Sequence, residues 1–479
     1  MDAVEQALKK LKQLDGEVTS EIIKDLISDH ASKRQEMIER YERYKASKHG
    51  TPILQRTFED KKKINNKLNN DYFSDIIDTK VGYFSGEPVS YQIDKNKFAD
   101  SEGSTGQQYD TAMDVLRNFK QRNNIPDLDA ETSKMAAICG YGARLCYIDK
   151  DGYERVMNVD PWECVFITDM SINEPQYSMR YYKVAINQGD KQSERWRVEW
   201  YDDNSVKYFI QDSTGNYQPD QEEPERPHMF EEVPLMGFPN NEEHQGDGDK
   251  VLELIDGVDR TLSDVNSEIE QFRLAYMYFK GMDISPYTDE QGNTVDPLER
   301  AKKTGGFEIP EDGDIGFITK MLEDSIIENH LNRLDNNIYK FSKTPNFLDE
   351  AFAGSQSGEA RKFKMLPFEN KCIVTERKFS AALTQMFKVI TSAWKKKGIN
   401  IDYLDIYFEF TRNFPLDLLH EAEATEKLKG QISEKRRLSL LSFIEDPEQE
   451  LEAMQEEMEG MIDLDNEPVE DEEAEDEEE

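Results

Sequence analysis

Few stretches of this 479-residue sequence place together residues that could perform chemistry. The run GSQSG, from Gly354 to Gly358, has the glycine spacing of a nucleophile elbow, but Gln356 stands where the nucleophilic serine would be. The sequence contains no glycine-rich loop that ends in Gly-Lys-Ser or Gly-Lys-Thr, which excludes a P-loop ATPase. These patterns therefore supply neither a catalytic nucleophile nor a nucleotide-binding loop.

Patterns that could bind a metal ion are equally sparse. The acidic turns at 149–152 and 247–250 are too short for a calcium loop, which needs further oxygen ligands at fixed positions. His244 lies among acidic residues but has no second histidine at a ligand spacing. Asp312 and Asp314 could join a two-metal nuclease site, yet nothing distinguishes them among 99 acidic residues. We therefore expect no metal, no cofactor and no enzymatic activity.

The charge of the chain is unevenly distributed. The net charge is −40, and 20 acidic residues without any Lys or Arg lie between Glu445 and Glu479. A self-repelling block of this kind predicts a disordered tail over 463–479, which either solubilises the chain or binds a basic partner. The basic clusters are short, and solvated helix faces are their simplest interpretation; they are Lys61–Lys63, Lys302–Lys303, Arg361–Lys364, Lys395–Lys397 and Lys435–Arg437.

The four cysteines, Cys139, Cys146, Cys164 and Cys372, form no Cys-x-x-Cys pair, which favours buried thiols in a reducing compartment. No run of 18 apolar residues occurs, so we expect no transmembrane helix, and the first residues lack an apolar signal segment.

Helical and strand periodicities alternate along the chain. The spacing of apolar residues predicts helices up to about residue 48, over Tyr72 to Val81, and over 108–123 and 128–140. From 140 to 237 the period changes to two, which predicts a β-rich module with a hairpin turn at 149–152 and a strand over His228–Pro239. Together these patterns predict an α+β fold with two to four structural units.

Two long helical patterns carry apolar residues at alternating spacings of four and three, which is typical of a packed helical seam. The first helix is expected to end at Gly281 and the second at Phe341. The first seam is Val251, Ile255, Val258, Leu262, Val265, Ile269 and Phe272. The second seam is Ile327, Leu331, Leu334, Ile338 and Phe341. Two such helices cannot bury their seams alone, whereas neighbouring copies of the chain could cover them.

A long, glycine- and serine-rich loop follows the second seam. It carries Phe347 and Phe352 and leads into a third helix that runs to about Lys397 and contains Pro367, which predicts a kink because proline lacks a backbone donor. A strand over 401–415 and a helix from Leu416 to about Met461 complete the expected elements.

The order of these parts resembles that of the portal proteins of tailed double-stranded-DNA phages, of the siphophage type. Four stretches between about 70 and 400 carry the similarity. They are DYFSDIIDTKVGYFSGEPVSY, PLMGFPNNEEHQGDGDKVLELIDGVDRTLSDVNSEIEQFRLAYMYFKG, SKTPNFLDEAFAGSQSGEARKFKMLPFENKC and ERKFSAALTQMFKVI. Pro367 and the long acidic tail depart from the family pattern.

The resemblance implies a ring of identical subunits, typically twelve, at one vertex of the capsid, with a channel for DNA entry and exit. It also implies the parts of the subunit. They are an N-terminal helical arm (1–60), a wing (61–250), a first stem helix (251–281), a clip (282–320), a second stem helix (321–341), a tunnel loop (342–357), a kinked wing helix with a strand (358–413), a helical crown (414–462) and the tail.

By the same resemblance, the seams form the stem and pack subunits together, and the tunnel loop faces the channel. The channel residues implied are Lys343, Phe347, Phe352, Gly354, Ser355, Gly358, Arg361 and Lys364. The partners implied are double-stranded DNA, the terminase large subunit, the major capsid and scaffolding proteins and a head-completion adaptor, without a membrane. The location implied is the virion, and the host cytoplasm during assembly. A coiled-coil scaffold or adaptor of the virion and a metal-dependent nuclease remain the alternatives.

Overall fold

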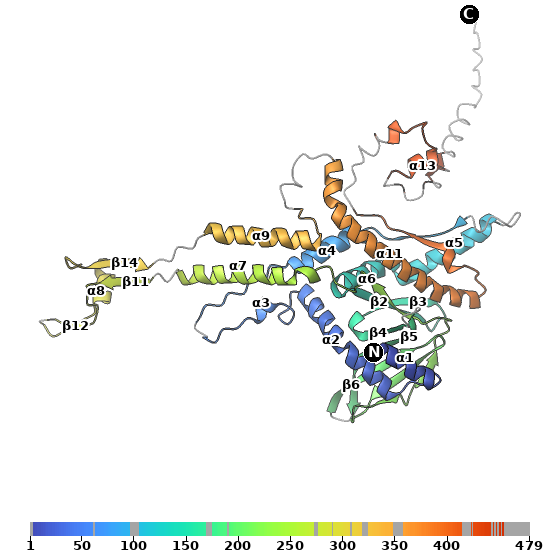
Figure 1. The fold of residues 1–479 in the computed structure, drawn as a ribbon, viewed down its shortest axis with the longest axis horizontal. Helices are drawn as coiled ribbons and strands as arrows, with labels where there is room; N and C mark the ends of the chain where they lie inside the picture. The colour runs from blue at the N-terminus through green and yellow to red at the C-terminus, as the bar shows by residue number, and fades with distance from the viewer. Residues whose placement is uncertain are drawn as a thin grey trace, which may run out of the picture. The chain divides into compact units, whose positions relative to one another are not determined.

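The structure, a computed structural model, divides into two units, Met1–Arg412 and Asn413–Glu479, and each is described by itself (Figure 1). The residues it describes are 3–60, 63–95, 105–168, 175–188, 191–272, 276–289, 291–306, 309–318, 324–347 and 358–413, with parts of 423–454.

The first unit begins with two helices that pack against a large sheet. The helices are α1 (Ala3–Gln13) and α2 (Ser20–Tyr44), and the side chain of Thr19 caps α2 by accepting a hydrogen bond from the Ile22 amide. Their buried aliphatic residues share one apolar cluster with Met179 and Trp200 of the sheet. Burial of this stripe is what holds the otherwise highly charged α2 in place.

Two antiparallel sheets follow, in the region where the sequence predicts a β-rich module. Strand order is β10-β2-β3 in the smaller sheet, and β4-β5-β6-β7-β8 in the larger sheet, where β9 also pairs with β7. The strands are β2 (Tyr141–Ile148), β3 (Glu154–Val159), β4 (Cys164–Thr168), β5 (Pro175–Gln188), β6 (Lys191–Tyr201), β7 (Ser205–Gln211), β8 (Tyr217–Pro219), β9 (Glu225–Pro227) and β10 (Leu235–Pro239).

The predicted hairpin is confirmed: β2 and β3 pair from Ala143↔Val159 to Ile148↔Glu154. Its turn is closed by Asp149, whose carboxylate accepts hydrogen bonds from two backbone amides, and Gly152 supplies the left-handed conformation with φ of 80°. The strand predicted over His228–Pro239 is wrong in its first half, because β10 begins at Leu235. Pro234 directly before it cannot donate a ladder hydrogen bond.

Three helices pack against the smaller sheet, and a fourth helix and a short sheet pack against these helices. The three are α5 (Thr105–Asn123), α6 (Ile125–Cys139) and the long α11 (Gly358–Lys396), the fourth is α4 (Tyr72–Phe84), and the short sheet is the pair β1 (Ser90–Ile93) and β15 (Ile406–Glu409). Pro367 lies inside α11, and Figure 1 shows α11 changing direction soon after its start. A short helix, α3 (Pro52–Gln55), lies between α2 and α4 in the sequence.

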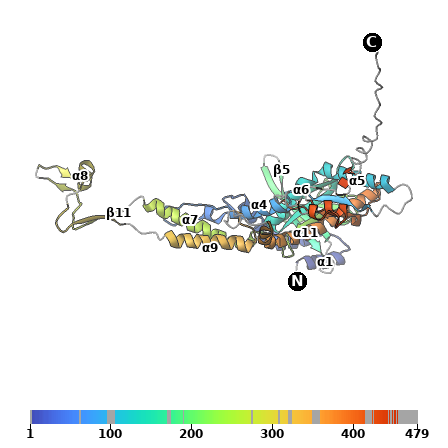
Figure 2. The same ribbon diagram turned by 90° about the horizontal axis from the view of Figure 1, so that it is seen from above.

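The two seamed helices are α7 (Leu252–Phe272) and α9 (Asp324–Ser342), which lie side by side (Figures 1 and 2). The first is shorter than predicted, because the helix expected to reach Gly281 ends at Phe272. Tyr276–Lys280 instead forms β11, which pairs with β14 (Asp314–Ile318). Aromatic residues favour the strand, and its backbone groups are satisfied by that partner.

Between β11 and β14 the chain forms the small hairpin of β12 (Tyr287–Thr288) and β13 (Thr294–Val295), and then α8 (Pro297–Thr304). Asp296 caps α8 by accepting hydrogen bonds from the amides of Leu298 and Glu299. These elements lie in the range predicted as the clip.

The described part of the second unit contains α13 (Glu434–Leu438), capped by Ser433. The single helix predicted from Leu416 to Met461 is wrong at 428–432, where a turn and an isolated bridge between Lys429 and Ile432 interrupt it. Gly430 adopts a φ of 77°, which a helix interior does not allow. Helices and antiparallel sheets together confirm the predicted α+β class. Among the described residues, no helix has the length and apolar character needed to cross a membrane.

Candidate functional site

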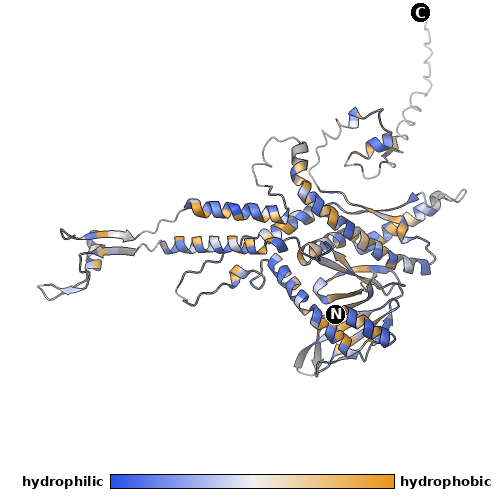
Figure 3. Ribbon diagram, in the orientation of Figure 1, coloured by the Kyte–Doolittle hydropathy of each residue, from blue (hydrophilic) through white to orange (hydrophobic). Residues whose placement is uncertain are grey.

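The seams of α7 and α9 belong to one apolar cluster near the start of α7. Val251, Ile255, Val258 and Ile338 are buried in it, and Leu262, Leu331 and Leu334 pack against it partly buried. Gly257 faces Leu334, and a Cβ at this position would lie 3.6 Å from Leu334 Cδ1, which is an ordinary van der Waals contact. Figure 3 shows hydrophilic and hydrophobic residues alternating along both helices.

Burial decreases toward the distal end of the helix pair, although Phe341, predicted as part of the second seam, is 49% exposed at the opposite end of α9. Ile269 is 52% exposed, and Val265 and Ile327 are only partly buried. Ile326, beside the second seam, is 61% exposed. In the isolated subunit, the distal part of this helix pair therefore presents apolar side chains to solvent.

A second face of α7 is covered by an extended segment, 64–71. The amides of Asn66, Leu68 and Asn70 donate hydrogen bonds to Ser267 Oγ (3.0 Å), Ser263 Oγ (2.9 Å) and Asp259 Oδ1 (2.8 Å) respectively. Two residues of an extended segment rise about 6.7 Å, and four residues of a helix rise about 6 Å. Every second residue of the segment therefore meets every fourth residue of α7. We call this segment the strap.

A buried ionic cluster joins α4, the loop before α7, α9 and α11. Lys80 Nζ lies 2.9 Å from Asp247 Oδ2 and donates hydrogen bonds to Asn240 Oδ1 (2.6 Å) and Thr375 Oγ1 (2.9 Å). Lys371 Nζ lies 3.0 Å from Asp247 Oδ1 and donates to the Ser342 carbonyl oxygen at 2.9 Å. These six residues, Lys80, Asn240, Asp247, Ser342, Lys371 and Thr375, are called the junction.

The charges of the junction depend on one another. Lys80 and Asp247 are both almost completely buried. Burial lowers the pKa of Lys80. Burial alone would raise the pKa of Asp247, but the neighbouring ammonium groups of Lys371 and Lys80 hold it below its usual range. The aspartate is therefore a carboxylate that anchors two lysines from different helices, and removing it would leave both without their counterion.

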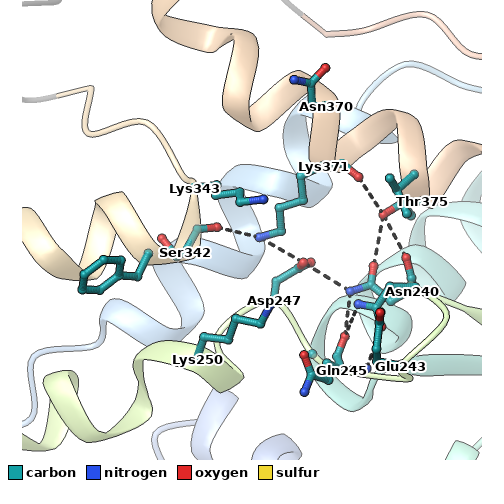
Figure 4. A pocket seen from close by; sticks show the side chains of 14 residues that line it. Asn240, Glu243, Gln245, Asp247, Lys250, Ser342, Lys343, Asn370, Lys371 and Thr375 are labelled. Carbon is teal, nitrogen blue, oxygen red and sulfur yellow. Dashed lines mark hydrogen bonds and ion pairs between the residues drawn. The ribbon is translucent and has the colours of Figure 1, made fainter.

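The junction opens into a pocket of about 330 Å³ (Figure 4). The loop 240–250, the end of α9 and one face of α11 line the pocket. Its polar rim includes Lys250, Lys343 and Asn370, all of which are exposed. Phe341 and Val374 add exposed apolar surface at the same opening.

The end of α9 has an unusual residue in its cap. Lys343 adopts a φ of 58°, and the Thr344 amide donates to the Tyr339 carbonyl oxygen, as in a Schellman cap. Glycine or asparagine is the residue type that favours this position, because a Cβ is strained there. The strained backbone fixes the direction in which the Lys343 side chain leaves the helix.

The structure places the predicted channel residues unevenly around this pocket. Lys343 lines the pocket, Phe347 is 52% exposed, and Lys364 is partly buried in α11. Gly358 is the first residue of α11, and Arg361 and Pro367 follow within that helix. Phe352, Gly354 and Ser355 lie outside the described residues, as do the side chains of Arg361 and Phe272.

Sequence reasoning missed the junction and the strap. Lys80 and Asp247 are separated by 167 positions, and although each lies in a stretch that carries the family resemblance, nothing in either stretch pairs the two residues. The strap had one usable signal, because Asp259, Ser263 and Ser267 recur every four residues and so share one helical face.

Comparison with known proteins decides the family. A family model described as "Phage portal protein, SPP1 Gp6-like" matches residues 23–463. The chain belongs to this family of phage portal proteins. It is 23% identical over 419 residues to the portal protein of Bacillus phage SPP1, covering 83% of this chain and 77% of that protein. It is 26% identical over 453 residues to the portal protein of Clostridium phage phiCD119, covering 90% and 94% respectively.

The portal protein family is structural rather than enzymatic. In this member, Asp314 accepts a hydrogen bond from Tyr278, and the four cysteines are buried and form no disulfide. Burial raises the pKa of the Cys139 and Cys146 thiols to about 12. No group of three or more His, Cys, Asp or Glu side chains converges within the part of the chain that the structure describes.

Proposed function

We propose that this portal-family chain forms a closed ring of identical subunits, typically twelve, at one vertex of the phage capsid. The ring encloses a channel through which double-stranded DNA enters during packaging and leaves during ejection. The observation that carries this proposal is the family match over residues 23–463, which includes the stem pair, the junction and the predicted clip.

The stem pair supports assembly. The exposed apolar residues Ile269 and Ile326 lie on α7 and α9, and a neighbouring subunit can cover them. In this arrangement α7 and α9 form the stem, residues 282–320 form the clip, and residues 342–357 form the tunnel loop. The wing, the crown and the tail have the ranges that the resemblance to portal proteins implies. The acidic net charge suits a channel in which DNA slides, because tight phosphate binding needs many Lys and Arg side chains.

We assign the docking of partners to the clip and to the wing. The terminase large subunit and a head-completion adaptor bind the clip in turn, and the major capsid and scaffolding proteins surround the wing. The ring then belongs to the virion, with assembly in the host cytoplasm.

Native mass spectrometry and negative-stain microscopy test the proposal. Twelve copies of 55.7 kDa give a closed particle of about 0.67 MDa with a central opening. A chain that stays monomeric at all concentrations, with and without capsid proteins, would contradict the ring. A two-chain particle would favour the alternative of a coiled-coil scaffold.

A further inference from the structure

The junction holds more positive than negative charge. Lys80 and Lys371 share the single carboxylate of Asp247. The carbonyl end of α9 at Ser342 offsets only about half a charge. By contrast, Arg144, another buried cation, has its own partner in Asp129 at 2.7 Å. The surplus at the junction therefore lies on Lys371, next to the pocket.

Lys371 also has an unused donor within the described structure. An ammonium group has three N–H donors, and the described partners of Lys371 are Asp247 and the Ser342 carbonyl. Lys80, by contrast, has one described partner for each of its three donors. The remaining N–H of Lys371 is available to an acceptor in the pocket, which Figure 4 shows opening beside the Lys371 side chain.

The rim adds two further ammonium groups. Lys250 and Lys343 line the pocket, and neither has a hydrogen-bond or ion-pair partner among the described residues. Glu243 is the one acidic residue that accompanies them on the lining besides Asp247. Lys343 occupies a left-handed position at which glycine would relieve strain, so the structure keeps a cation at a site where backbone geometry disfavours it.

We propose that this pocket binds a phosphate group of the double-stranded DNA that passes through the ring. The proposal rests on the proposed function. A phosphodiester supplies one negative charge and oxygen acceptors for Lys371, Lys343 and the Asn370 amide. The pocket volume of about 330 Å³ is large enough for a phosphate and part of its sugar. The site is a local positive feature in a chain of net charge −40, so it contacts the backbone without regard to base sequence.

The test measures binding of a short DNA duplex to the assembled ring by fluorescence anisotropy at several salt concentrations. Lys343→Asn removes the charge but suits the left-handed backbone, so its unfolding midpoint should stay unchanged or rise. Asn370→Asp places a negative charge at the pocket without touching the junction. Each variant should bind the duplex about tenfold more weakly. Lys343→Asn should also make the slope of log affinity against log salt concentration less negative by about 0.9, because one phosphate contact is lost.

Matched controls carry the same chemical change elsewhere. Lys303→Asn changes an exposed side chain of α8, and Asn118→Asp changes an exposed side chain of α5. Both should bind the duplex like the wild-type ring. Equal weakening by a control and its matched variant would mean non-specific electrostatics and would overturn the pocket.

Three further outcomes would also overturn it. One is duplex affinity unchanged in Lys343→Asn and Asn370→Asp. Another is a pocket-dependent response, by calorimetry, to inorganic phosphate but not to the duplex. In the third, the variants fail to assemble into rings but keep their affinity for the duplex. That result would identify an acidic group of a neighbouring subunit as the occupant of the pocket. If the variants assemble and package DNA normally, the pocket proposal fails while the ring stands; if the wild-type chain forms no ring, the proposed function fails.

Discussion

Lys80 and Arg144 are both withdrawn from solvent, but their surroundings differ. Arg144 donates to Asp129 and Thr132, and its guanidinium lies 4.7 Å from the ring centre of Phe238. Arg144 does not share its counterion Asp129 with another cation, so the Arg144–Asp129 pair is neutral and belongs to the core. Lys80 shares its counterion with Lys371 from another helix, and that sharing leaves charge for the pocket.

His30 makes the stability of the N-terminal helices depend on pH. Its Nδ1 lies 2.8 Å from Tyr181 Oη, and burial, with Arg34 and Lys33 nearby, lowers the pKa of His30 to about 4. The unfolded chain takes up this proton near pH 6.5, whereas the folded chain does not, so stability falls as pH falls from 7 toward 4. Between pH 7 and pH 5 this loss is about 2 kcal/mol.

The measurement is urea unfolding at pH 7 and pH 5. His30→Gln should remove about 2 kcal/mol of the difference between the two conditions. His49→Gln, which changes an exposed histidine at the end of the same region, should leave the difference as in the wild type. An unaltered pH dependence in His30→Gln would show that other groups control the acid sensitivity.

At the scale of elements, α7 lies between two supports. Along one face the strap donates backbone hydrogen bonds to Asp259, Ser263 and Ser267. Along another, α9 packs its seam against Ile255 and Val258. The buried contact with α9 acts mainly on the first part of α7, whereas the strap reaches as far as Ser267, and the distal part still exposes Ile269.

This gradient predicts that equal substitutions on one seam have unequal effects. Ile255 is 1% exposed, so Ile255→Asp places an unpaired charge in the cluster and should cost more than about 3 kcal/mol of unfolding free energy. The matched variant Ile269→Asp changes a half-exposed position of the same helix and should cost under about 1 kcal/mol. Denaturant unfolding of the subunit measures both.

If ring neighbours cover the distal seam, Ile269→Asp should instead reduce the fraction of assembled rings. Equal loss of subunit stability in both variants would contradict the burial gradient along α7.

Local patterns in the sequence predicted the elements that depend on local residues. Asp149 and Gly152 define the hairpin turn, and the apolar spacing of Ile255 and Val258, with Val251 directly before the helix, defines the inner face of α7. The same spacing did not predict where α7 ends. The aromatic residues from Tyr276 to Lys280 fit a helix as well as a strand until β14 is available as a partner.

The junction could not be predicted, because its members come from separate parts of the chain. Lys80, Asp247 and Lys371 meet only when α4, the loop before α7 and α11 pack together. A single lysine in an apolar helical pattern is no different in sequence from one that reaches solvent. Lys343 was predicted as a site residue because it lies next to the loop in the sequence. Its left-handed backbone conformation could be recognised only in the structure.

At the scale of the whole molecule, net charge opposes assembly. Each subunit carries −40, so copies brought into a ring repel one another at low ionic strength. Added salt screens charges separated by more than about 10 Å, while apolar contacts along the stem persist. We therefore expect the fraction of rings to rise as sodium chloride is raised.

Sedimentation velocity over a range of salt concentrations measures this fraction. Rings that dissociate as salt is added would contradict the expectation and would show that ion pairs between subunits hold the assembly together. A monomeric mutant such as an assembly-defective Ile269→Asp chain provides the reference sedimentation rate.

The pairing of β1 with β15 has a consequence for synthesis. Ser90 and Glu409 are opposite each other in this ladder although they are 319 positions apart in the sequence, and the ring of Tyr91 packs edge-on against that of Phe408. On the ribosome, α1, α2 and the larger sheet can fold while the rest of the chain is still being made. The first unit, however, cannot close until translation has passed Glu409. If the subunits form the proposed ring, its assembly is expected to begin from nearly complete chains, because chains that end before Ile406 lack the strand that completes the subunit.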